Sequence, residues 1–144
     1  MKINELKVFL QQKKCRLKGC SGSDVRNIEK YFKIVLPSEY KEFLYAMGRG
    51  ADKFMLGSTA FYDRILYLKE DMISTLEEKG KSLPDNTFVF WSHQGYQFAF
   101  FYLNDGYNPP VYFYSEGENF NDYQKVEESF TDFLTAQLEM SGLT

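Results

Sequence analysis

At 144 residues, the chain has the length of one ordinary domain, and it carries a net charge of −3. No apolar run in it approaches the roughly 20 residues that a membrane-spanning helix needs. Residues 1–6 lack the apolar segment and small-residue cleavage site of a signal peptide. We therefore expect a cytoplasmic protein that does not bind membranes. Aromatic residues make up 18% of the chain, which predicts a core rich in rings.

The first third of the chain is predicted to be helical. Apolar spacing predicts a helix over residues 3–13, and Ser23 or Asp24 can cap a second short helix. Pro37 is expected to begin a third helix, and Gly48 stands where a left-handed C-terminal cap is common. The apolar residues of this third helix recur at helical spacing and are expected to form one buried stripe: Tyr40, Phe43, Leu44 and Met47.

The rest of the chain is predicted to contain a sheet and two more helices. Residues 54–56 and 65–67 are expected in short strands and loops, followed by a polar helix over 69–79. An antiparallel meander is predicted next, with three strands at residues 86–91, 96–103 and 111–114. Turns at residues 93–95 and 104–106 would join them. Ser129 can cap a last helix. The order of elements predicts a single α+β domain, residues 1–144, with a central antiparallel meander and helices packed mainly on one face.

The third helix also carries a recognisable pattern. Leu36, Pro37, Tyr40, Phe43 and Leu44 form Leu-Pro-x-x-Tyr-x-x-Phe-Leu, which resembles the SUKH superfamily of fungal cell-wall assembly regulators and small bacterial proteins. The resemblance runs from about Ser23 to the C-terminus. The sequence differs from the usual family pattern just after the helix, where Met-Gly-Arg-Gly at residues 47–50 replaces the more typical Asn-Gly-Gly-like turn.

This resemblance implies a function in protein binding. Bacterial members of the superfamily look like immunity proteins that neutralise a toxin domain, often a nuclease, and fungal members are signalling and cell-wall scaffolds. Neither branch is known for catalysis. The resemblance therefore implies a non-enzymatic protein whose partner is a basic protein toxin.

Charge is distributed unevenly along the chain. Residues 1–50 carry 11 Lys/Arg and 5 Asp/Glu, a net of +6, whereas residues 51–144 carry 6 and 15, a net of −9. A local acidic group contains Glu116, Glu118, Asp122, Glu127, Glu128 and Asp132. Such a group is either a solvated face or a surface for a positively charged protein, which it would attract in a salt-dependent way.

We predict the partner-binding surface within this acidic region. The toxin would be contacted by Glu116, Glu118, Asp122 and Tyr123, with Tyr114 as an aromatic anchor. The basic stretch at residues 13–18 is read as a solvated helix end, so nucleic acid is not expected as a partner. We expect a monomer or a weak homodimer.

Catalytic, metal and cofactor motifs are missing from the sequence. No phosphate-binding loop, nucleophile elbow or His-Glu-x-x-His is present. His93 is interpreted as an exposed loop residue, and a small hydrolase that uses His93 is the weaker alternative. Cys15 and Cys20 are interpreted as two reduced thiols, because a zinc site would need two further ligands. We expect no catalytic residues, no metal and no cofactor.

A second functional class remains open. The chain could be a regulatory scaffold or a small-ligand-binding module of the cell-wall assembly regulator type. This hypothesis predicts an apolar pocket between the helices and the meander, lined by tyrosines and Trp91.

Overall fold

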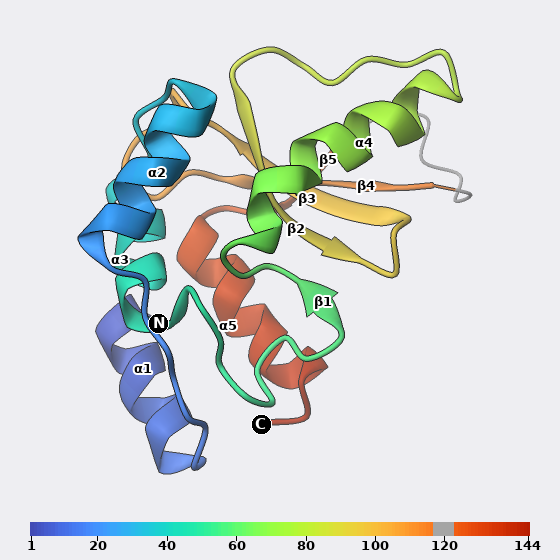
Figure 1. The fold of residues 1–144 in the computed structure, drawn as a ribbon. Coiled ribbons are helices and arrows are strands. Elements are labelled where there is room, and N and C mark those ends of the chain that lie inside the picture. Colours follow the sequence, from blue (N-terminus) through green and yellow to red (C-terminus); the bar gives the residue numbers. More distant parts are fainter. Residues whose placement is uncertain (117–122) are drawn as a thin grey trace.

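The computed structural model describes residues 1–116 and 123–144. Three helices precede the sheet, α4 follows the first strand, and α5 comes last (Figure 1). In chain order, the elements of the described residues are α1 (Ile3–Gln12), α2 (Gly22–Phe32), α3 (Ser38–Met47), β1 (Ser58–Thr59), the 3-10 helix η1 (Arg64–Tyr67), α4 (Leu68–Glu77), β2 (Thr87–His93), β3 (Gln97–Tyr102), β4 (Val111–Ser115), β5 (Gln124–Glu127) and α5 (Phe130–Met140). None of the helices in this part of the chain is long and apolar enough to cross a bilayer.

The strands form one antiparallel sheet in the order β1-β2-β3-β4-β5. Strands that follow one another in sequence are therefore neighbours in the sheet, as in a meander. The three predicted strands are its centre, and the predicted α+β class is confirmed. β5 was not predicted, because its four residues include three charged or amide side chains and give no apolar alternation.

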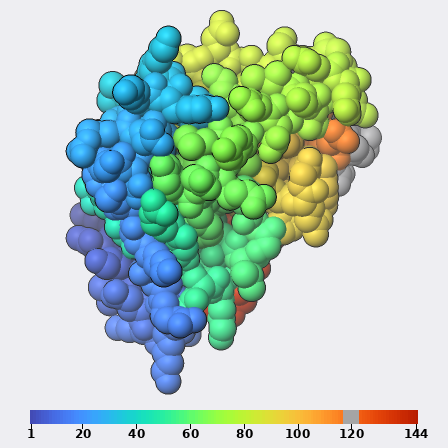
Figure 2. All heavy atoms as spheres, viewed as in Figure 1, coloured from blue at the N-terminus to red at the C-terminus, as the bar shows by residue number. Residues whose placement is uncertain are grey.

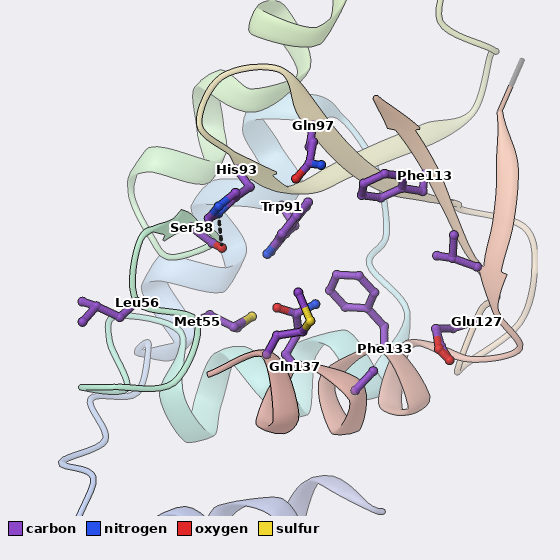
Figure 3. A pocket seen from close by; sticks show the side chains of 13 residues that line it. Met55, Leu56, Ser58, Trp91, His93, Gln97, Phe113, Glu127, Phe133 and Gln137 are labelled. Carbon is purple, nitrogen blue, oxygen red and sulfur yellow. Dashed lines mark hydrogen bonds between the residues drawn. The ribbon is translucent and has the colours of Figure 1, made fainter. Parts of the chain in front are cut away.

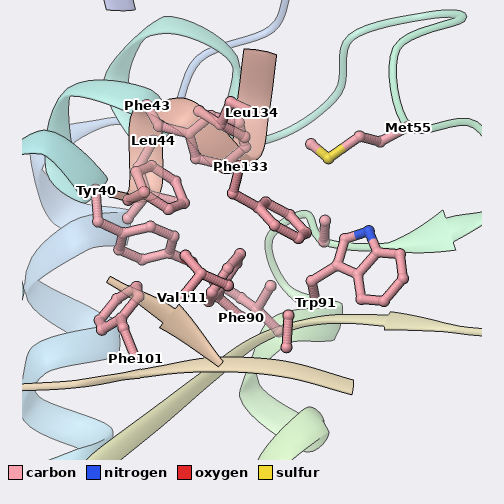
Figure 4. Packing of buried hydrophobic residues seen from close by; sticks show 14 of the residues in the cluster. Tyr40, Phe43, Leu44, Met55, Phe90, Trp91, Phe101, Val111, Phe133 and Leu134 are labelled. Carbon is pink, nitrogen blue, oxygen red and sulfur yellow. The ribbon is translucent and has the colours of Figure 1, made fainter. Parts of the chain in front are cut away.

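The main core lies between the sheet and the helices α3 and α5 (Figure 4). Tyr40 of α3 is completely buried, and its ring centroid lies 5.3 Å from Phe88, 5.4 Å from Phe101 and 5.2 Å from Phe130. The residues of the family pattern are all buried: Leu36, Pro37, Tyr40, Phe43 and Leu44. The pattern thus lies within the core.

The opposite face of the sheet is covered by α4, which packs against β2. Phe88 points to α3, so strand alternation turns Val89 toward α4. Figure 2 shows the side chains of η1 and α4, in green, over the face of the molecule that is turned to the viewer. The aromatic strand β3 is thus covered on both sides, and residues 98–101 are buried, as predicted for a core strand.

The ends of two helices differ from the sequence prediction. Ser21, not Ser23 or Asp24, caps α2: its hydroxyl accepts from the Asp24 N–H at 3.1 Å, and the Asp24 carboxylate accepts from the Ser21 N–H at 3.0 Å. Gly48 has φ −65°, so it is not a left-handed cap. A Cβ there would lie 2.6 Å from Cys20 Sγ, so glycine is needed for close packing instead.

The segment between α3 and α4 also differs from the sequence prediction, which expected short strands there. Residues 54–56 form a turn and not a strand, with Met55 at φ +57°. Residues 65–67 belong to η1, and the strand that pairs with β2 is Ser58–Thr59. Short apolar runs of this kind fit a strand or a helical turn equally well, so periodicity could not distinguish them.

Candidate functional site: an apolar groove between α5 and the sheet

A groove with a volume of about 530 Å³ lies between α5 and the sheet (Figure 3). We call it the Trp91 groove. The turn before β1, all five strands and α5 contribute its walls, which are mostly apolar. Its lining residues are Met55, Leu56, Ser58, Trp91, His93, Gln97, Phe113, Val126, Glu127, Phe133, Ala136, Gln137 and Met140.

A β-bulge places Trp91 in this groove. The pairing of β2 with β3 shifts between Val89 and Trp91, so Phe90 is the extra residue. Side chains normally alternate between the two faces of a strand, but a bulge locally resets the alternation. Phe90 and Trp91 consequently lie on the same face, and both rings contact Phe133 of α5.

A second bulge acts in the same way on β5. Val111 pairs with Glu127 and Tyr112 with Lys125, which leaves Val126 as the extra residue. Val126 and Glu127 are consecutive, and both line the groove. In a regular strand, two consecutive side chains point to opposite faces of the sheet. The two bulges place consecutive side chains on the same face, and in this way they bring Trp91 and Val126 into the lining of the groove.

One end of the groove is polar. Trp91 is 6% exposed, and among the described residues nothing accepts a hydrogen bond from its Nε1. The Trp91 ring stacks on His93, with centroids 5.9 Å apart and an interplanar angle of 10°. His93 Nδ1 lies 3.1 Å from Ser58 Oγ (Figure 3).

The structure corrects the interpretation of His93. It is the last residue of β2, half-buried in the groove, and not an exposed loop residue. In the described residues, no carboxylate bonds to its ring. The Ser58–His93 pair therefore lacks the acidic group that orients the imidazole in a hydrolytic triad.

The other end of the groove is acidic. Burial and the nearby charges of Asp132 and Glu128 raise the pKa of Glu127. Glu128 forms an ion pair with Lys125 at 3.1 Å. The backbone N–H of Asp132 donates to the hydroxyl of Ser129, which caps α5 as predicted. We call Glu127, Glu128 and Asp132 the β5–α5 acidic cluster.

The rim of the groove exposes apolar side chains. Leu56 and Met140 are each 79% exposed, and Val126 is 42% exposed. Isolated exposed apolar residues are common on protein surfaces, but a group around one apolar hollow marks a binding surface. The groove and its rim are therefore the best candidate site among the described residues.

The two tyrosines of the predicted partner-binding surface, Tyr114 and Tyr123, do not line the groove. Tyr114 is 2% exposed, and it alternates with Phe113, so it faces the side of the sheet opposite the groove. Its ring packs 6.0 Å from that of Tyr123, whose hydroxyl donates to the Ser82 carbonyl. Tyr114 is thus a core residue and presents no exposed ring.

The acidic members of that prediction are only partly described. Glu116 follows β4 and is half-buried. Glu118 and Asp122 lie outside the described residues. Of the six acidic residues grouped from the sequence, the structure brings together Glu127, Glu128 and Asp132.

The predicted pocket between the helices and the meander is present, with Trp91 in its wall. No tyrosine lines it, contrary to the expectation. Sequence reasoning missed Met55, Gln137 and Met140 as site residues, because nothing in the sequence indicates that the turn after α3 lies beside α5. The Met55 N–H donates to Ser141 Oγ at 2.9 Å and fixes that contact.

Metal or thiol chemistry has little basis in the described residues. No three His, Cys, Asp or Glu side chains gather there as a metal site. Cys15 and Cys20 are free and buried. Burial raises the pKa of the Cys20 thiol to about 11, so it is not a reactive thiolate near neutral pH.

Comparisons with known proteins agree with the pattern in α3. A model of the SMI1 / KNR4 family (SUKH-1) matches residues 19–136, which is most of the chain. The comparison with curated proteins finds no match.

Proposed function

Because the chain belongs to the SMI1 / KNR4 family (SUKH-1), we propose that it is an immunity protein of the cytoplasm. In this proposal it acts without catalysis. It binds a toxin domain such as a nuclease and neutralises the toxin by covering its basic active site.

The observation that carries this proposal is the β5–α5 acidic cluster beside an exposed apolar rim. A nuclease must present positive charge to bind phosphates, and carboxylates can occupy the same site. Opposite charges accelerate association and reject wrong partners, while buried apolar contacts slow dissociation. The net charge of −9 over residues 51–144 adds attraction at longer range.

The proposal is tested by capture followed by rescue. The tagged chain is incubated at low salt with lysate from its source organism and from neighbouring strains, and bound protein is eluted with a salt gradient. We expect a basic protein that kills cells when it is expressed alone and is harmless when it is coexpressed with the chain. A captured protein that is not toxic, or whose toxicity the chain does not relieve, would contradict the proposal.

A second candidate function is favoured by one observation, the groove with the unpaired Trp91 Nε1–H. A regulatory scaffold or small-ligand-binding module would use such a pocket for an apolar molecule with one acceptor oxygen. Salt separates the two functions. Binding of a basic toxin should weaken steeply between low and physiological salt, whereas binding of an uncharged ligand in the pocket should hardly change.

A further inference from the structure

The Trp91 groove has three properties that define what it can bind: apolar walls, one unpaired donor and an acidic end. We propose that the groove is the surface on which the toxin docks. An apolar side chain of the toxin enters the groove, and a lysine or arginine beside it pairs with Glu127. This inference rests on the proposed immunity function and specifies its contact surface.

The apolar walls set the first requirement. Phe113 and Phe133 form the inner wall between Trp91 at one end and Glu127 at the other (Figure 3). Ala99 pairs with both Trp91 and Phe113 in the sheet, and the ring centroids of these two residues lie 6.0 Å apart across it. The volume of about 530 Å³ falls within the range of pockets that hold a drug-sized ligand, so it can take a leucine or phenylalanine side chain.

The unpaired donor sets the second requirement. Trp91 Nε1–H is buried, and no described residue accepts its hydrogen bond. A buried donor without an acceptor is unfavourable, and tryptophan in a binding surface usually bonds to the partner. A peptide segment that lies in the groove offers backbone carbonyl oxygens, which are suitable acceptors.

The acidic end sets the third requirement, the charge of the segment. Glu128 is paired with Lys125, but Glu127 makes no ion pair within the described residues. Glu127 also lies close enough to Asp132 and Glu128 to be repelled by both. A cation from the partner would relieve this repulsion, and an acidic segment would increase it. The occupant is therefore apolar and basic.

Trp91 is the only tryptophan of the chain, so one label reports on the groove. The chain is produced with 5-fluorotryptophan, and its single ¹⁹F resonance is followed while capped Arg-Leu-Phe-Arg is added to millimolar concentration. Capped Glu-Leu-Phe-Glu serves as the matched probe. We expect a saturable shift with the basic peptide and a much smaller one with the acidic peptide. Equal shifts with both peptides, or none with either, would overturn the inference.

Three variants locate the binding surface. Met140→Arg blocks the rim with a cation, and Glu127→Lys reverses the charge of the acidic end; each should weaken binding of the basic peptide at least tenfold. Trp91→Phe keeps an aromatic ring but removes the donor, and it should weaken binding of the captured toxin about two- to tenfold. Val8→Arg is the control, since Val8 is also an exposed apolar residue on a helix, but on α1. It should bind as the wild type does.

The same variants in the rescue assay separate the two proposals. If the wild-type chain and Val8→Arg neutralise the captured toxin while Met140→Arg and Glu127→Lys do not, both proposals are supported. If all four neutralise it equally, the toxin docks elsewhere and only the groove inference fails. If the wild-type chain neutralises no toxin, the proposed function fails, whatever the peptides show. Thermal unfolding of each variant checks that the fold is intact.

Discussion

Phe90 and Trp91 are consecutive residues of β2, yet the rings of both pack edge-on against Phe133, at centroid distances of 5.2 and 5.7 Å. The bulge at Phe90 makes this possible. Phe133 therefore belongs both to the core and to the wall of the Trp91 groove. The groove is an extension of the packed core, so its shape should not depend on a partner.

Removal of the Phe133 ring should weaken the core and open the groove together. Phe133 is buried, so Phe133→Ala should lower the free energy of unfolding by about 3–5 kcal/mol, as other large-to-small changes in cores do. Trp91 would lose a neighbour, and its fluorescence emission should shift to the red. Urea unfolding followed by circular dichroism, with the emission spectrum of the folded state, measures both effects.

Phe133→Leu is the control for that prediction. It keeps an apolar side chain at the site, so it should cost clearly less than Phe133→Ala. Equal losses for leucine and alanine would contradict this prediction, because they would mean that the stabilisation comes from the ring contacts and not from the apolar volume.

The Asp24–Arg49 pair should make stability fall in acid. Arg49 donates to the Asp24 carboxylate from Nε at 2.8 Å and from Nη2 at 2.9 Å. These bonds, with the Ser21 N–H, lower the pKa of Asp24 to about 2. A lowered pKa in the folded state means that the stabilisation is present above the ordinary pKa of aspartate, about 3.9, and is lost as pH falls toward 2.

Urea midpoints at pH 6 and pH 2.5 test this prediction. Asp24→Asn cannot ionise, so its midpoint should lie below that of the wild type at pH 6, and the difference should be clearly smaller at pH 2.5, where part of the wild-type stabilisation has been lost. A constant difference between the two proteins at both pH values would exclude a contribution from ionised Asp24.

Tyr40→Phe should not destabilise the protein. The Tyr40 hydroxyl is buried and has no hydrogen-bond partner among the described residues, and burial raises its pKa well above the usual value. Loss of this unpaired group should change the free energy of unfolding by about 0 to +1 kcal/mol, because the ring contacts remain. Tyr40→Ala, which removes them, should cost about 3–5 kcal/mol. A clear loss of stability in Tyr40→Phe, measured by urea unfolding, would reveal a partner for the hydroxyl.

Glu127→Gln should stabilise the protein at neutral pH while it weakens toxin binding. The raised pKa of Glu127 means that the folded state holds its proton more tightly than the unfolded state does. The carboxylate therefore costs stability as pH rises above the ordinary range of glutamate, about 4.3. The urea midpoint of Glu127→Gln should exceed that of the wild type at pH 7, and the difference should shrink as pH falls below that range.

The helices and central strands could be predicted because their signals are local. Tyr40, Phe43, Leu44 and Met47 recur at helical spacing, and all four are buried in α3. Ser129 was predicted as the cap of α5, and its hydroxyl accepts from the Asp132 N–H at 3.1 Å. The short elements were less predictable, because residues 65–67 fit a strand or a 3-10 turn equally well.

The candidate site could be anticipated only in part. A pocket containing Trp91 was expected, and one is present, but the aromatic anchor chosen from the sequence, Tyr114, is buried on the other face of the sheet. Alternation along β4 gives the two faces of that strand, but it does not show which face remains open to solvent.

The sequence by itself determined the family, the α+β class and the residues of the core, because periodic apolar side chains must be buried wherever the chain folds. Only the tertiary structure decided the position of the groove. Bulges at Phe90 and Val126 arise from the pairing of neighbouring strands, and the contact of Met55 with Ser141 joins segments far apart in the chain. Such pairings depend on the packing of the whole domain, and no local pattern of residues specifies them.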